Sequence, residues 1–179
     1  MHRRKLRILI IRLSSIGDVV RTLPVLHGLR AACPSAQVDW VVERKSAAIL
    51  EGHPCLDNLI VFERSKGFFQ AAKQFLSICG RIRKARYDLV LDLHGILKSG
   101  VLAGFSRAPD RVGFARPRSR EGSSLFLNKR VRVSSDSLTR VEENLELCRA
   151  VVNRFVAPPI TIYVPSETQD SVNHFFDET

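Results

Sequence analysis

Short apolar runs alternate with longer amphipathic stretches along most of this chain. A continuous, β-branched apolar run predicts a strand buried on both faces, whereas apolar residues three or four positions apart predict a helix with one buried side. We therefore expect strands at Leu6-Leu13, Gln37-Glu43, Asn58-Phe62, Tyr87-Leu93, Arg111-Phe114 and Lys129-Val133, and a closing extended segment at Ile160-Val164. Helices are expected at Val19-Ala32, Ser46-Leu50, Phe68-Ala85, Ile96-Phe105 and Ser137-Asn153, with one helical turn at Ser123-Asn128.

This alternation predicts an α/β fold. Strands separated by helices of ten or more residues form βαβ units, so their sheet is parallel and helices cover its faces. The length of 179 residues suits one domain of ordinary size, which we place at residues 1–165. Residues 166–179 are polar and acidic, and we expect them to form a connector or tail.

The composition is that of a globular protein, with 45% hydrophobic and 26% charged residues. Basic residues precede an apolar run at the start of the chain, as in a signal peptide, but Arg7 and Arg12 interrupt that run, so we expect a buried strand there. No stretch approaches the length of a transmembrane helix. Because no Cys-x-x-Cys pair and no His/Cys cluster with zinc spacing occurs, we expect reduced thiols in a cytosolic protein and no metal site; the cysteines are Cys33, Cys55, Cys79 and Cys148.

The formal net charge is +10, and three interpretations stay open. The basic side chains can form a solvated surface, attract an anionic membrane or phosphorylated lipid, or bind nucleic acid. Nucleic acid is the weakest of the three because the aromatic residues do not interleave with the basic clusters and no nucleic-acid-binding motif is visible.

The loop Ser14-Asp18 follows the first predicted strand and precedes a helix. In an open parallel sheet ligands bind beyond the carboxyl ends of the strands, where helix N-termini present free N–H groups. Gly17 would allow a tight turn and a close approach of a ligand to the backbone. Neither spacing of the glycine-rich nucleotide fingerprints is present. Asp18 is therefore either a plain helix N-cap or a carboxylate that can serve as general base.

Four ordered motifs carry a resemblance to a known family. They are IRLSSIGDVVRTLPVLHGLR followed by VDWVVE, then YDLVLDLHGILKSG at Tyr87-Gly100, RVGF at Arg111-Phe114 and SREGSSLFLNKRV at Ser119-Val131. Over roughly residues 6 to 150 the chain resembles the amino-terminal half of bacterial ADP-heptose:lipopolysaccharide heptosyltransferases of the heptosyltransferase I type, in glycosyltransferase family 9.

The resemblance implies the GT-B arrangement, in which two Rossmann-like halves face a cleft, and a metal-independent inverting transfer of heptose from ADP-heptose to the Kdo-lipid A inner core. It implies that Asp18 is the catalytic base that takes a proton from an acceptor hydroxyl of Kdo. It also implies a cytoplasmic enzyme, peripheral at the inner face of the inner membrane, that binds no nucleic acid and needs no cofactor.

Further positions match the family with less specific motifs. The resemblance implies that Ser14, Ser15 and Gly17 shape the loop, and that Lys98 faces the cleft. It places the acidic groups of the acceptor near Arg120, and Kdo carboxylates or lipid A phosphates near Arg64 and Lys66, although each of these basic residues could equally be a solvated surface side chain.

Two departures from the family pattern concern the helix at 137–153 and the fourth strand end. Relatives often carry His-x-Val-x-Arg where this chain has Thr139, Val141 and Glu143, and often have Gln where His94 stands. The first departure removes any contact of that His and Arg. The second could alter the choice of acceptor or have no effect.

The donor half of the family follows the residues that match Ile160-Pro165, so we expect ADP-heptose to be bound mainly by a carboxy-terminal domain absent from this chain. The chain alone is then expected to be inactive, because catalysis needs both reactants held together. We expect the chain to be a truncated product, one part of a split enzyme whose partner is a separately encoded carboxy-terminal half, or an isolated domain. The alternative is a non-catalytic binding module for anionic lipid or saccharide.

Overall fold

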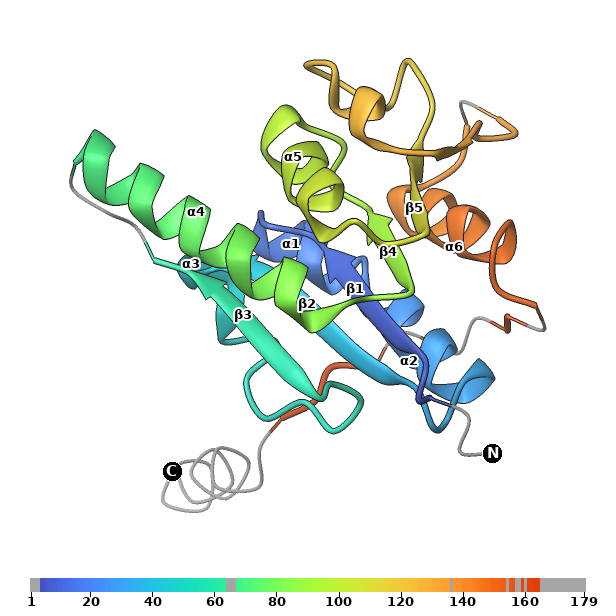
Figure 1. The fold of residues 1–179 in the computed structure, drawn as a ribbon. Helices are drawn as coiled ribbons and strands as arrows, with labels where there is room; N and C mark the ends of the chain where they lie inside the picture. The colour runs from blue at the N-terminus through green and yellow to red at the C-terminus, as the bar shows by residue number, and fades with distance from the viewer. Residues whose placement is uncertain are drawn as a thin grey trace, which may run out of the picture.

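The computed structural model describes residues 4–63, 67–135, 137–153, 155–156, 159 and 161–164. Six parallel strands form one sheet in the order β3-β2-β1-β4-β5-β6, which confirms the predicted Rossmann-like α/β fold (Figure 1). The strands are β1 (Arg7–Ile11), β2 (Gln37–Glu43), β3 (Asn58–Phe62), β4 (Leu89–Asp92), β5 (Asp110–Phe114) and β6 (Lys129–Val131).

Helices cover both faces of the sheet (Figure 1). They are α1 (Ile16–Val20), α2 (Leu23–Ala32), α3 (Arg44–Ala47), α4 (Phe68–Ala85), α5 (Leu97–Ser106) and α6 (Arg140–Arg149), with a 3-10 turn at Ser123–Phe126. Among these residues, no helix has both the length and the apolar composition that a membrane span requires.

Two hydrophobic clusters fill the space between the layers. Ile8 and Ile10 of β1 point into the cluster beneath α1, α2, α3 and α6, whereas Leu9 and Ile11 point into the cluster beneath α4 and α5. Successive side chains of a strand face opposite sides, so a strand covered on both faces must be apolar throughout. The central strand therefore cannot move without disturbing both cores, and it holds the loop that follows it in place.

The expected helix Val19-Ala32 is two helices, because the chain bends at Arg21 and Thr22. Pro24 stands in the first turn of α2, where its missing N–H costs nothing, whereas in a continuous helix it would remove an internal hydrogen bond. Thr22 stabilises the bend by donating its hydroxyl to the carbonyl of Asp18 over 2.8 Å. α1 begins at Ile16, after the N-cap Ser15, and therefore earlier than predicted.

The apolar face expected along all of α4 is buried only near its carboxyl end, at Ile78, Cys79 and Ile82. The amino-terminal turns extend past the sheet (Figure 1), and there Phe68 is 82% and Leu76 61% exposed. α6 begins later than predicted because Thr139 and Glu142 form a capping box at its start, and it ends at Arg149. Ile160 lies outside the described residues, and 161–164 belong to no strand.

Candidate functional site

The loops after β1 and β4 meet at the carboxyl edge of the sheet, since these two strands are neighbours in the centre. Asp18 lies in the first turn of α1, three residues after the N-cap Ser15. Its Oδ2 is 2.5 Å from Nη2 of Arg12, and its Oδ1 is 3.3 Å from Nη1 of Arg21. The carboxylate thus faces the edge at which α/β proteins bind ligands.

The charge of Asp18 is set by its neighbours. Burial alone would raise the pKa of Asp18. The Arg12 guanidinium and the hydrogen bonds from the Ser15 backbone and Arg21 together outweigh burial, so this pKa lies below its ordinary value. Asp18 is therefore ionised at neutral pH, which is the state required of a group that accepts a proton.

Arg12 is the central cation of this site. Its guanidinium donates to the carbonyl of Leu93 as well as pairing with Asp18, and only 13% of its side chain is exposed. Burial lowers the pKa of Arg12, and the Asp18 carboxylate partly offsets this. Because Leu93 follows β4, Arg12 connects the two loops on which the site is built.

His94 is neutral and has a defined tautomer. Its Nδ1 accepts a hydrogen bond from the backbone N–H of Leu13 over 3.1 Å. Burial, with a further contribution from Arg12, lowers the pKa of His94 to about 4. The single ring proton must then be on Nε2, so the imidazole can donate a hydrogen bond but carries no charge.

Asp92 holds the turn that carries His94. Its carboxylate is fully buried and accepts hydrogen bonds from the backbone N–H groups of His94 (3.1 Å) and Gly95 (3.0 Å) and from the hydroxyl of Ser99 (3.1 Å). Burial raises the pKa of Asp92 to about 6. Gly95 has a φ of +76°, a conformation that favours glycine, so the turn depends on both residues.

Glu143 supplies the second carboxylate of the site. It is 1% exposed and forms ion pairs with Arg118 and, over 3.0 Å, with Arg140. Buried carboxylates need such partners, because an unpaired buried charge is costly. A cavity of about 20 Å³, with room for about one water molecule, lies between these groups and Asp18. Its other lining residues are Arg12, Leu93, His94, Phe114 and Asn144.

A larger groove of about 820 Å³ lies between the carboxyl ends of β2 and β3 and the amino-terminal half of α4. Phe62, Phe68, Phe75 and Leu76 form its apolar wall. Lys98 stands at its border, with Nζ 3.1 Å from Oε1 of Glu43 and 4.2 Å from the centre of the Phe62 ring. Arg44, Lys45 and Glu63 also line the groove, so it combines apolar and charged surface.

Comparison with known proteins decides the family. The sequence profile of glycosyltransferase family 9 (heptosyltransferase) matches residues 75–171. The chain belongs to this family. The lipopolysaccharide heptosyltransferase 1 of Pseudomonas aeruginosa is 34% identical over 121 residues, which cover 65% of this chain and 34% of that protein. Its counterpart from Escherichia coli K12 is 31% identical over 148 residues, which cover 79% of this chain and 46% of that protein.

Solved family 9 structures share the fold. The glycosyl transferase family 9 protein of Veillonella parvula superimposes with a TM-score of 0.81 at 23% identity, covering 97% of this chain and 49% of that one. The E. coli heptosyltransferase WaaC with ADP gives a TM-score of 0.71 at 28% identity, covering 88% and 50%. The chain thus spans between a third and a half of the relatives named here.

The structure places the residues predicted for the site at two separate cavities. Asp18 lies in the cavity described above and Lys98 at the groove, while Ser15 is the N-cap of α1 and Ser14 precedes it. Gly17 lies in regular helix, without a positive φ, and a Cβ there would meet only Arg21 at 4.0 Å, so the expected tight turn at Gly17 is wrong.

Of the three other predicted basic residues, the structure describes Arg120. The side chain of Arg120 is exposed and lines neither cavity, whereas Arg118, two positions earlier, lines the Asp18 cavity. Arg64 and Lys66 lie outside the described residues. The roles of these three residues stay predictions.

Sequence reasoning did not assign Arg12, Arg118 or Arg140 to the site. The sequence did contain a signal for Arg12, since a lone cation at the end of an otherwise apolar strand needs a partner. Arg118 and Arg140 had none, because they reach the cavity from separate segments through their shared partner Glu143.

Proposed function

We propose that this chain is the acceptor-side part of a lipopolysaccharide heptosyltransferase that uses ADP-heptose as donor and Kdo-lipid A as acceptor. The observation that carries the proposal is the ionised Asp18, paired with Arg12, at the ligand-binding edge of a family 9 domain. The named relatives are lipopolysaccharide heptosyltransferases, which supports the choice of substrates.

In the proposed step, Asp18 accepts the proton of an acceptor hydroxyl while that oxygen bonds to the anomeric carbon of heptose. The bond from this carbon to the diphosphate oxygen breaks on the opposite face, and its electron pair leaves with ADP, so the anomeric centre is inverted. A positioned carboxylate of this kind contributes about 10²–10⁴-fold to a rate. No metal ion takes part in this scheme.

Arg12 has two parts in this proposal. While it is paired with Asp18, it keeps the carboxylate ionised but also weakens it as a base. Its Nε is buried without a hydrogen-bond partner within the described part of the chain, as is typical of a donor that meets a ligand or a water molecule. An acidic group of the acceptor that bonds to Arg12 would compete with Asp18 for this cation and so strengthen the base.

The donor would bind chiefly to sequence beyond the acceptor-side domain, which we place at residues 1–165, with 166–179 as connector. We propose that the reaction takes place at the cytoplasmic face of the inner membrane, where a lipid acceptor is held. The apolar wall of the groove and the cations Arg44, Lys45 and Lys98 support an amphiphilic, anionic acceptor.

The test is heptose transfer from ADP-heptose to Kdo-lipid A, measured on the chain joined to or mixed with a family 9 donor domain. Asp18→Asn should reduce kcat at least about 100-fold. The matched control is Asp110→Asn, which removes a carboxylate 43% exposed that pairs with Lys129, and it should leave the rate unchanged. An active pair whose rate does not respond to Asp18→Asn would contradict the base assignment.

A second candidate, a non-catalytic module for anionic lipid or saccharide, is favoured by the groove itself. It predicts that the chain alone binds vesicles that contain lipid A, that this binding weakens with salt, and that a donor domain never adds transfer activity. Failure of the chain to bind such vesicles at low salt would remove this candidate.

A further inference from the structure

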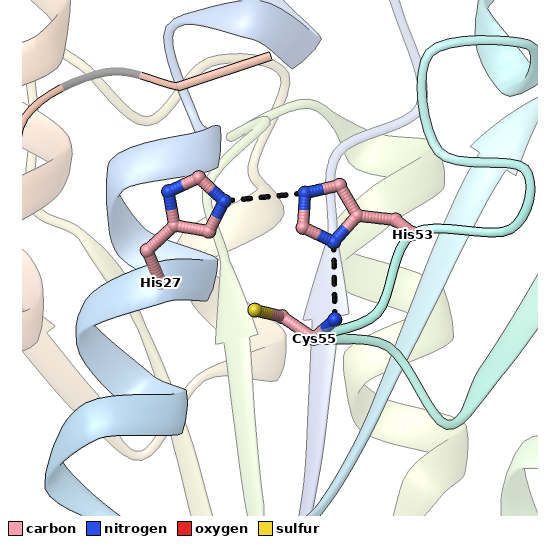
Figure 2. Close-up of side chains that lie close together, drawn as sticks. All are labelled: His27, His53 and Cys55. Atoms are coloured by element: carbon pink, nitrogen blue, oxygen red, sulfur yellow. Dashed lines mark hydrogen bonds between the residues drawn. The ribbon is translucent and has the colours of Figure 1, made fainter. Parts of the chain in front are cut away.

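A second polar cluster lies apart from the Asp18 site. His27 comes from α2, and His53 and Cys55 come from the connection between α3 and β3 (Figure 2). The Nε2 atoms of the two rings are 3.1 Å apart, and the three side-chain donor atoms, Cys55 Sγ included, lie within 4.8 Å of one another. None of the three lines either cavity described above.

The contacts define how the two rings share a proton. Nδ1 of His53 accepts a hydrogen bond from the backbone N–H of Cys55 over 3.2 Å, so neutral His53 carries its proton on Nε2. This proton lies between the two Nε2 atoms, and the facing atom of His27 offers a lone pair. Three groups thus converge on one point. They are a lone pair of His27, a proton of His53 that a cation can replace, and the thiol of Cys55.

The spacing suits a transition-metal ion. Zinc binds imidazole nitrogen at about 2.0–2.1 Å, so an ion at this distance from two nitrogens that are 3.1 Å apart would make an N–metal–N angle of about 100°, close to tetrahedral. In Figure 2 the sulfur lies to the side of the line between the rings, next to the gap. Even at a separation of 4.8 Å, the sulfur would need to approach by only about 1 Å to reach the zinc–sulfur distance of about 2.3 Å.

We propose that His27, His53 and Cys55 form a site for a divalent transition-metal ion, zinc in particular, with the fourth position taken by water. Two imidazoles and one thiolate are a ligand set that selects zinc over magnesium or calcium. On binding, the Cys55 thiol proton passes to solvent, and the His53 proton moves from Nε2 to Nδ1. The rings turn to face the ion, and the bond from the Cys55 N–H is given up.

The surroundings hold two of the ligands while leaving access for an ion. Arg30 donates to the carbonyl of Cys55 over 2.8 Å and to Asp57 over 2.7 Å, which fixes this part of the connection. His53 is 4% exposed. The Tyr163 ring packs edge-on against it, with 5.7 Å between the two ring centroids. His27 and Cys55 are half-buried, so an ion can enter from their side.

Spacing in the sequence did not indicate this site. His27 is 26 positions from His53, and only His53-x-Cys55 is local. The cluster forms because α2 and the connection to β3 pack side by side, held by the contacts of Arg30. The site is independent of the proposed sugar transfer.

The experiment is titration of the reduced, chelator-treated chain with Co²⁺, a spectroscopic substitute for zinc. We expect a saturable thiolate-to-cobalt absorption band in the near ultraviolet, which Zn²⁺ displaces. Cys55→Ser should abolish the band, and Cys33→Ser, which alters the other half-buried cysteine, should leave it unchanged. His27→Gln, on an accessible helix position, should weaken binding at least tenfold.

Thermal unfolding gives a second readout that needs no thiolate band. An ion that binds only the folded state raises the melting temperature of the protein as the ion concentration increases. The same Zn²⁺ concentration should therefore stabilise the wild type more than His27→Gln. A wild-type chain with no saturable cobalt band, or equal binding by wild type, Cys55→Ser and His27→Gln, would overturn the proposal. Neither result depends on heptose transfer.

Discussion

Arg12 and Asp18 form an ion pair with Nη2 and Oδ2 2.5 Å apart, although one residue follows a buried strand and the other belongs to a helix. The pair lies at the end of β1, the strand on which both hydrophobic clusters rest. The geometry of the pair is therefore fixed by the core. The protonation state of Asp18, the proposed base, depends on a cation that the fold holds in place.

Replacing Arg12 should raise the pKa of Asp18. In Arg12→Met, burial of the carboxylate is no longer offset by the ion pair, so the group stays protonated to higher pH. The measurement is an NMR titration of carbon-13-labelled aspartate side chains. Arg21→Met is the control. Because Arg21 contacts Asp18 at the longer distance of 3.3 Å, this change should raise the pKa of Asp18 by less. Equal titration curves for Arg12→Met and the wild type would contradict the ion-pair interpretation.

His94→Gln should alter the acid limb of the stability curve. The folded-state pKa of His94 is about 4, below the ordinary value of 6.5, so its contribution to stability is full above about pH 6.5 and is lost as the pH falls toward 4. Glutamine can still accept from the Leu13 N–H but does not titrate. The free energy of unfolding, measured with urea between pH 4 and 7, should depend less steeply on pH in the variant. The contribution of His53 to this dependence remains. An unchanged slope would contradict a lowered pKa, because it would show that His94 titrates alike in the folded and unfolded chain.

Two glycines in helices should respond oppositely to alanine. A Cβ at Gly100 would lie 2.7 Å from the carbonyl oxygen and 2.8 Å from Cα of Ser123, a clash with backbone, so Gly100→Ala should destabilise by about 1–3 kcal/mol. At Gly80 of α4 a Cβ meets nothing within 4 Å, and Gly80→Ala should stabilise by about 0.5–1 kcal/mol. Urea midpoints would measure both, and a shift in the same direction would refute the packing argument.

The apolar wall of the groove should matter for lipid binding and little for folding. Phe68 is 82% and Leu76 61% exposed, so Phe68→Ser and Leu76→Ser should change stability by no more than about 0.5 kcal/mol. Burial of such a side chain in lipid is favourable by about 1.5–3 kcal/mol, so each change should weaken binding to lipid A vesicles about tenfold or more. Leu125→Ser, at a residue 79% exposed but outside the groove, is the control, and an equal loss there would indicate non-specific adsorption.

Much of the fold could be predicted because its determinants are local. The apolar runs of β1, β2 and β3 and the amphipathic pattern of α5 depend on neighbouring residues only. The split between α1 and α2 was missed because the helical pattern on both sides of Pro24 stays in phase. The exposed turns of α4 were missed because periodicity shows an apolar face without showing whether anything covers it.

The candidate site was predictable to a smaller extent. Asp18 could be placed because the carboxyl end of a central strand is a general position for ligands. Arg118 and Glu143, which are 25 positions apart, meet through packing of α6 beside the sheet. Such a pair leaves no periodic trace in the sequence, and neither does the contact of His27 with His53.

The strand order divides the sheet into two wings that join only where β1 pairs with β4. Asp18 follows the innermost strand of one wing, and His94 follows the innermost strand of the other. Each wing is one continuous stretch of the chain, residues 7–62 and 89–131. A single genetic crossover within α4 would therefore exchange one wall of the site as a unit, leaving Asp18 and Arg12 together on the other. If the proposed function holds, chimaeras between relatives should change the acceptor while the proposed base stays the same.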